Sequence, residues 1–131
     1  MTGDLHFLVY STILAWIMLL TASLLRTRYW TTQGMLLAFG NRDNLPEPSA
    51  IAGRARRAAW NMLENFVLFT ALLVAAHAAG VTGPKVELGA KIFFWARVVY
   101  FPLYLAGIMY VRSVAWLAGV IGMGLILAAV L

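Results

Sequence analysis

The sequence predicts an all-α integral membrane protein, built as a bundle of four transmembrane helices. Hydrophobic residues make up 63% of the 131 residues and charged residues 11%. In a typical soluble domain, about 45–50% of the residues are hydrophobic and about 25% are charged. The chain divides into four apolar segments, each near the roughly 20 residues that cross a hydrocarbon core about 30 Å thick. Its length is enough for a single domain.

The first expected helix covers residues 5–25. It is too long, and too weakly basic at its start, to be typical of a cleaved signal peptide. The connection that follows, residues 26–53, is the only long one. Its polar, proline-containing stretch at residues 41–48 predicts a loop.

The second expected helix covers residues 54–79 and carries a polar stripe. The stripe consists of Arg54, Arg57, Asn61 and Glu64. Their spacing of three, four and three places them within roughly 80° of one another on a helix that turns about 100° per residue. Ionisable groups in a membrane helix are costly to hold there, so the stripe indicates a functional site. The alternative is that its arginines only anchor the helix by reaching lipid headgroups.

The third expected helix covers residues 86–107 and carries a second one-faced stripe, Arg97, Tyr100 and Tyr104. Arg97 is about half-way along the helix and is unsuited to face lipid, so we expect it to pair with Glu64. That pair either belongs to a ligand site or only holds the bundle together. The two tyrosines are either site residues or packing residues.

The fourth expected helix covers residues 111–131 and opens with Arg112 and Ser113. The connection before it is very short, which predicts that the third and fourth helices form a tight antiparallel pair. A patch of glycines within residues 119–124 favours close contact with a neighbouring helix.

The distribution of basic residues predicts the orientation. The arginines near the long connection and the third connection are Arg26, Arg28, Arg42, Arg54, Arg56, Arg57 and Arg112. Only Lys85 and Lys91 lie near the second connection. The positive-inside rule therefore places residues 26–53 and the third connection in the cytoplasm, with both termini on the opposite side. The polar residues of three helices would then meet in one cavity on the cytoplasmic side, with Arg26 nearby as either a ligand or a membrane anchor.

Composition also excludes several classes of site. Cysteine is absent, which excludes disulfides and thiolate metal sites. The two histidines, His6 and His77, lack the spacing of metal ligands, so we expect no metal. The net charge of +5 follows from the arginines that flank the apolar segments, and no nucleic-acid partner is expected.

Four stretches of the chain together resemble one known family. They are Asn-Arg-Asp-Asn-Leu-Pro-Glu-Pro at residues 41–48, Gly-Arg-Ala-Arg-Arg-Ala-Ala-Trp-Asn-Met-Leu-Glu-Asn-Phe at residues 53–66, Ala-Arg-Val-Val-Tyr-Phe-Pro-Leu-Tyr at residues 96–104, and Val-Arg-Ser-Val-Ala-Trp at residues 111–116. They resemble the MAPEG family, membrane-associated proteins in eicosanoid and glutathione metabolism. The resemblance covers essentially the whole chain and is to a prokaryotic-type member, which implies a bacterial inner membrane.

The resemblance implies a homotrimer in membrane lipid, with glutathione as co-substrate bound between neighbouring subunits. By position, it implies that glutathione is held by Arg26, Arg57, Asn61, Glu64, Arg97, Tyr100 and Tyr104. Arg112 would stabilise the thiolate, with Ser113 beside it. Arg54 joins the expected ligand-binding set through its place on the stripe.

The implied function is that of a membrane-bound, glutathione-dependent transferase or peroxidase acting on small apolar electrophiles or lipid hydroperoxides. Arginines suit the two carboxylates of glutathione, and Glu64 suits its ammonium. A nearby guanidinium favours the reactive thiolate over the thiol. An alternative from another class is a non-enzymatic membrane protein that binds a lipid or other anionic ligand in the same cavity.

Overall fold

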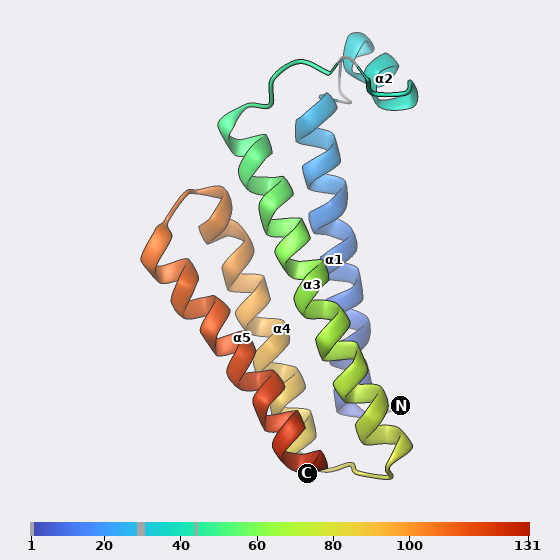
Figure 1. Ribbon diagram of the computed structural model, residues 1–131, viewed down its shortest axis with the longest axis vertical. Helices are drawn as coiled ribbons and strands as arrows, with labels where there is room; N and C mark the ends of the chain where they lie inside the picture. Colours follow the sequence, from blue (N-terminus) through green and yellow to red (C-terminus); the bar gives the residue numbers. More distant parts are fainter. Residues whose placement is uncertain (1, 29–30, 44) are drawn as a thin grey trace.

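The computed structural model describes residues 2–28, 31–43 and 45–131 (Figure 1). Its helices are α1 (Gly3–Thr27), α2 (Thr32–Phe39), α3 (Ala50–Ala78), α4 (Pro84–Leu105) and α5 (Met109–Val130). All except α2 are long and apolar enough to cross a membrane. The described part of the chain contains no strand. The predicted all-α architecture with four spanning helices is therefore confirmed.

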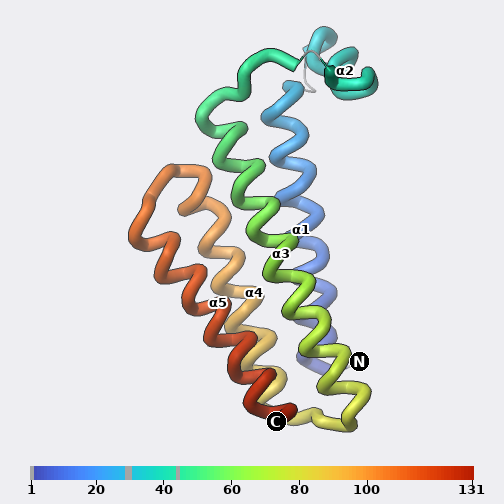
Figure 2. The backbone as a smooth tube through the Cα atoms, viewed as in Figure 1, coloured from blue at the N-terminus to red at the C-terminus, as the bar shows by residue number. Residues whose placement is uncertain are grey.

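The four long helices run alongside one another as an up-and-down bundle. Figure 2 shows both termini and the α3–α4 connection at one end, which we call the terminal end. The opposite end, which we call the α2 end, holds α2, the start of α3 and the α4–α5 connection. Helix α1 packs mainly on α3, while α4 and α5 form the most extensive helix pair. The predicted antiparallel pairing of the last two helices is thus confirmed.

Two glycines let α4 and α5 approach to backbone contact. A Cβ atom placed on Gly89 would lie 2.5 Å from the carbonyl oxygen of Gly122, and one placed on Gly122 would lie 2.6 Å from the carbonyl oxygen of Gly89. Both distances are far below normal van der Waals separation, so neither position has room for a larger residue. By contrast, Gly124 has no neighbouring atom within 4 Å of such a Cβ. The predicted glycine patch is therefore a contact surface at Gly122 but not at Gly124.

The apolar core lies between the four long helices and extends along much of the bundle. The rings of Phe69 on α3 and Phe93 on α4 stack with their centroids 4.0 Å apart and their planes 16° from parallel. Both rings are fully buried, as are Met18 on α1 and Ile126 on α5. All four long helices therefore contribute to one core, which fixes how α3 and α4 lie against each other.

The terminal end is closed by a polar contact between α1 and α3. His77 Nε2 and Asp4 Oδ2 are 2.5 Å apart, and the Asp4 carboxyl is buried. The sequence indicates of His77 only that it lacks the spacing of a metal ligand. The structure adds that it joins the last turn of α3 to the first turn of α1.

The long connection differs from the prediction, because part of the expected loop 26–53 is helical. Helix α2 is only 8 residues long and contains a glycine, so its sequence shows no helical period. Helix α3 also begins at Ala50 instead of residue 54, since the Ser49 side chain caps it by accepting a hydrogen bond from the Ala52 N–H at 3.2 Å. The described residues of the stretch 41–48 are not helical, as predicted; Asn44 lies outside the described residues.

Candidate functional site

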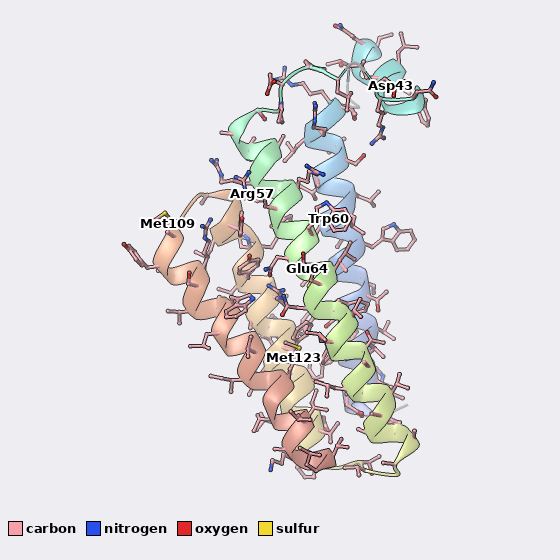
Figure 3. All side chains as sticks on the ribbon, in the orientation of Figure 1. Asp43, Arg57, Trp60, Glu64, Met109 and Met123 are labelled. Atoms are coloured by element: carbon pink, nitrogen blue, oxygen red, sulfur yellow. The ribbon has the colours of Figure 1, made fainter. Side chains whose placement is uncertain are left out.

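The polar stripe of α3 lies opposite a face of small residues. Ala52, Ala55, Ala59 and Met62 follow the same spacing of three and four and are buried, which turns the stripe toward the side of the bundle. Arg57 and Glu64 are exposed along it, whereas Asn61 is half-buried. Figure 3 shows Arg57, Trp60 and Glu64 in order along α3, from near the α2 end toward the middle of the bundle. The stripe is thus available to a ligand or to a neighbouring molecule.

A cleft of about 450 Å³ opens between this stripe and α4. Its walls are Arg56, Arg57, Trp60, Asn61, Glu64, Tyr100 and Tyr104. A second cleft, of about 250 Å³, is lined by Asn61, Tyr100, Tyr104, Arg112, Ser113 and Trp116. The two share Asn61 and both tyrosines, so we treat them as two lobes of one site and call it the polar groove. The α3 lobe holds Arg57 and Glu64 of the stripe, and the α5 lobe holds Arg112 and Ser113.

Arg97 lies beneath the groove and has a different partner from the one the sequence predicts. Its side chain is 1% exposed. Its Nη2 donates to the side-chain oxygen of Asn61 at 2.8 Å and to the main-chain oxygen of Asn61 at 3.0 Å. The expected pair with Glu64 is wrong for the single chain, because Glu64 stays on the exposed face of α3 while Asn61, about one turn earlier, faces α4. Among the described residues, the buried Nη1 of Arg97 has no hydrogen-bond partner.

Two adjacent tyrosine rings lie along the floor of the groove, with one arginine against each of them. The guanidinium carbon of Arg97 lies 4.7 Å from the centroid of the Tyr100 ring. The Tyr100 ring meets the Tyr104 ring edge-on, with centroids 5.4 Å apart. The guanidinium carbon of Arg112 then lies 4.3 Å from the centroid of Tyr104. These distances are within the range of cation–π attraction, so both tyrosines help to hold the arginines in place.

Arg112 is the half-buried cation of the α5 lobe, and it has no carboxylate partner among the described residues. Beside it, the Ser113 hydroxyl donates to the Met109 carbonyl at 3.1 Å, within its own helix. A guanidinium that rests on an aromatic face keeps its N–H donors at its edges. The α5 lobe can therefore stabilise a negatively charged atom that enters it.

Two of the arginines in the expected site lie outside the groove in the single chain. Arg54 Nε donates to the Leu105 carbonyl at 2.8 Å and so joins the start of α3 to the last turn of α4. Arg26 lines a separate cleft of about 370 Å³ at the end of α1, which we call the α1–α2 cleft. The structure therefore unites Arg57, Asn61 and Glu64 with the residues of α4 and α5, but it places neither Arg54 nor Arg26 with them.

Three residues that line the groove were not among the expected site residues: Arg56, Trp60 and Trp116. The helical period could have identified both tryptophans. Trp60 follows Arg57 by three and precedes Glu64 by four, and Trp116 follows Ser113 by three. Trp60 is 55% exposed and Trp116 is 39% exposed, so both indoles offer apolar surface beside the charged groups.

Comparison with known proteins supports the expected relationship. A model described as the MAPEG family matches residues 7–131, which is nearly the whole chain and includes every groove residue. Searches among curated proteins and among solved structures gave no significant match.

Proposed function

The chain belongs to the MAPEG family and is a multi-pass integral membrane protein, and from this premise we propose that it is a glutathione-dependent transferase or peroxidase. Its substrates would be small apolar electrophiles or lipid hydroperoxides that reach the groove from the bilayer. The observation that carries the proposal is the charge arrangement of the polar groove. One lobe combines two arginines with one glutamate, and the adjoining lobe holds a further arginine.

The groove fits glutathione group by group. Glutathione has two carboxylates and one ammonium, and the α3 lobe offers Arg56 and Arg57 for the carboxylates and Glu64 for the ammonium. Asn61 is held by Arg97 through its oxygens. Its amide nitrogen forms no hydrogen bond to another described residue, so it remains a donor for the peptide backbone of the ligand.

In the proposed reaction, bound glutathione supplies a thiolate whose sulfur forms a new bond to the electrophile, as the leaving group departs with its electron pair. With a hydroperoxide, the sulfur bonds to the terminal oxygen as the O–O bond breaks, and the departing alkoxide takes up a proton and leaves as the alcohol. A second glutathione then reacts with the resulting sulfenic acid to give the disulfide and water. Arg112 stabilises the thiolate by charge and by hydrogen bonding, and Tyr104 holds the Arg112 guanidinium in position. Ser113 lies beside Arg112 as a second polar group. Trp60 and Trp116 provide apolar walls against which the electrophile packs.

We further propose that the protein works as a homotrimer, in which a neighbouring subunit covers the groove. Arg57 and Glu64 are exposed in the single chain, and the buried Nη1 of Arg97 has no partner among the described residues. Polar groups at membrane depth need partners from protein, because lipid offers none. Arg26 would then reach a glutathione carboxylate in a site that it shares with a neighbouring subunit.

The proposed location is a bacterial inner membrane, with the α2 end facing the cytoplasm. The distribution of basic residues supports this orientation. Most of the arginines lie at the α2 end, whereas Lys85 lies at the terminal end. The positive-inside rule places the arginine-rich α2 end in the cytoplasm. Substrate would enter the groove from the cytoplasmic half of the bilayer.

The test is an activity assay with the purified full-length protein, glutathione and either an aromatic halide or a lipid hydroperoxide. We expect Arg112→Ala to lower kcat/KM by about a hundredfold, since it removes one charged stabiliser of the reacting sulfur. Lys85→Ala is the matched control, because Lys85 is exposed and distant from the groove. Activity that is the same in Arg112→Ala and wild type would overturn the proposed mechanism. The absence of saturable glutathione binding to the wild-type protein would instead favour the non-enzymatic lipid- or anion-binding alternative.

A further inference from the structure

The α1–α2 cleft is a second charged site, separate from the polar groove. Its walls are Leu25, Arg26, Thr27, Arg28, Thr31, Gln33, Gly34, Leu37, Pro46, Glu47, Pro48 and Ser49. Glu47 is the one acidic side chain among these described residues, and it faces a cleft that also holds two arginines. The cleft therefore offers both signs of charge within a volume of about 370 Å³.

The cleft has a fixed wall, because α2 rests directly on the end of α1. A Cβ atom on Gly34 would lie 1.8 Å from the Arg28 carbonyl oxygen and 2.2 Å from the Thr27 carbonyl oxygen, so only glycine allows this approach. The Thr31 hydroxyl also donates to the Arg28 carbonyl at 2.9 Å and accepts from the Gly34 N–H at 2.9 Å. Thr31 thus caps α2 and ties it to α1 at the same point.

The position of the cleft points to the membrane surface. Helix α2 lies beyond the end of the spanning helix α1 (Figure 2). On its outer face, Met35, Leu36 and Phe39 are 49%, 73% and 85% exposed. A short helix with large exposed apolar side chains, placed where a membrane span ends, is suited to lie in the interface of the bilayer. The adjoining cleft is then at the depth of the lipid headgroups.

We propose that the α1–α2 cleft binds the headgroup of an aminophospholipid, of which phosphatidylethanolamine is the simplest. Arg28 binds the phosphate, because a guanidinium matches phosphate oxygens with two parallel donors. Glu47 accepts hydrogen bonds from the primary ammonium. This site does not depend on the proposed enzymatic function, and it leaves Arg26 available for the role proposed above.

The chemistry of the cleft separates this lipid from its competitors. An anionic phosphatidylglycerol has no cation for Glu47 and leaves that carboxylate without a partner beside the headgroup. Phosphatidylcholine has a cation, but its quaternary ammonium has no N–H to donate. Only a headgroup with both a phosphate and a primary ammonium satisfies Arg28 and Glu47 together.

The test measures lipid retention by native mass spectrometry of the full-length protein, purified in mild detergent with equal amounts of phosphatidylethanolamine, phosphatidylcholine and phosphatidylglycerol. We expect wild type to retain phosphatidylethanolamine roughly tenfold more than either competitor, as one extra charge-assisted interaction allows. Glu47→Gln should remove the preference over phosphatidylcholine while keeping some lipid bound. Arg28→Gln should lower retention of all three lipids. Lys85→Gln, the matched control at the other end of the bundle, should behave as wild type.

Three results would overturn the proposal. The first is an unchanged preference for phosphatidylethanolamine in Glu47→Gln, and the second is a wild-type preference for phosphatidylglycerol. The third is loss of the bound lipid when glutathione is added at millimolar concentration, which would show that the cleft takes a soluble zwitterion instead. Because Arg28 and Glu47 are both exposed, neither substitution threatens the fold, and unchanged thermal unfolding of the two variants provides the check.

Discussion

Arg97 donates two hydrogen bonds to a single residue, Asn61, at 2.8 Å to its side-chain oxygen and at 3.0 Å to its main-chain oxygen. Asn65 donates to the same main-chain oxygen at 2.9 Å. The floor of the polar groove is thus tied together across α3 and α4 before any ligand enters. Glu64, which the sequence suggests as the partner of Arg97, stays exposed at the groove and available for a ligand.

Asn61→Leu should destabilise the protein by about 2–3 kcal/mol, because it removes the side-chain acceptor of the buried Arg97 guanidinium and leaves only the main-chain oxygen. Thermal unfolding in detergent measures the effect. Asn61→Asp keeps an acceptor in place and should stay within about 1 kcal/mol of wild type. The double variant Asn61→Leu with Arg97→Leu should recover part of the loss. A single variant Asn61→Leu that unfolds at the wild-type temperature would contradict the structural role of this contact.

Gly122→Ala and Gly89→Ala should each cost about 1–3 kcal/mol, because the added methyl group meets a backbone carbonyl of the facing helix. Gly124→Ala is the matched control, since its methyl group meets no neighbouring atom within 4 Å. That variant should unfold within about 1 kcal/mol of wild type. Equal unfolding temperatures for Gly122→Ala and Gly124→Ala would show that α4 and α5 do not approach as closely as described.

Tyr104→Leu should lower kcat/KM of the proposed reaction by about 2- to 30-fold, as expected for the loss of one cation–π contact to Arg112. Tyr104→Phe keeps the ring and should retain most of the activity. The comparison separates the aromatic face from the hydroxyl, because only the leucine variant lacks the ring. If the two variants lose activity equally, the ring is not what positions Arg112.

Asp4→Ala should loosen the terminal end of the bundle, since it removes the partner of His77. Hydrogen exchange in the first turns of α1 should increase, and the overall stability should fall by about 1–3 kcal/mol. His6→Ala is the matched control, because the contacts of the His6 ring among the described residues stay within its own chain segment: the Thr2 carbonyl at 3.0 Å and the Tyr10 ring, with centroids 6.2 Å apart. Exchange that rises no more in Asp4→Ala than in His6→Ala would mean that the contact does not hold α1 to α3.

The spanning helices could be predicted from sequence because hydropathy and length are properties of each segment alone. The same holds for the faces of the two stripes, which follow from the helical period. Helix α2 could not be predicted, since its stability comes from the contact of Gly34 with the end of α1 and from the Thr31 cap. Such tertiary contacts are absent from the local pattern.

The partner of Arg97 could not be predicted because it depends on how α3 and α4 are shifted along each other. Asn61 and Glu64 lie about one turn apart on the same stripe, and both are chemically suitable. The shift is set by packing, including the stack of Phe69 on Phe93 and the close approach of Gly89 to Gly122. Likewise, the contact of Asp4 with His77 joins residues 73 positions apart, and neither residue has a sequence neighbour that indicates it.

The burial of Arg97 has a consequence for how the protein enters the bilayer during synthesis. Helix α4 is the least apolar of the four spans, and an arginine at the centre of a membrane helix costs about 2.5–3.5 kcal/mol on insertion. Within the described part of the chain, both of its acceptors belong to Asn61 of α3, which leaves the ribosome first. We therefore expect α3 to stabilise α4 in the membrane while α4 is being inserted. Substitutions at Asn61 should consequently reduce the fraction of newly made chains in which α4 is inserted, in addition to weakening the finished protein.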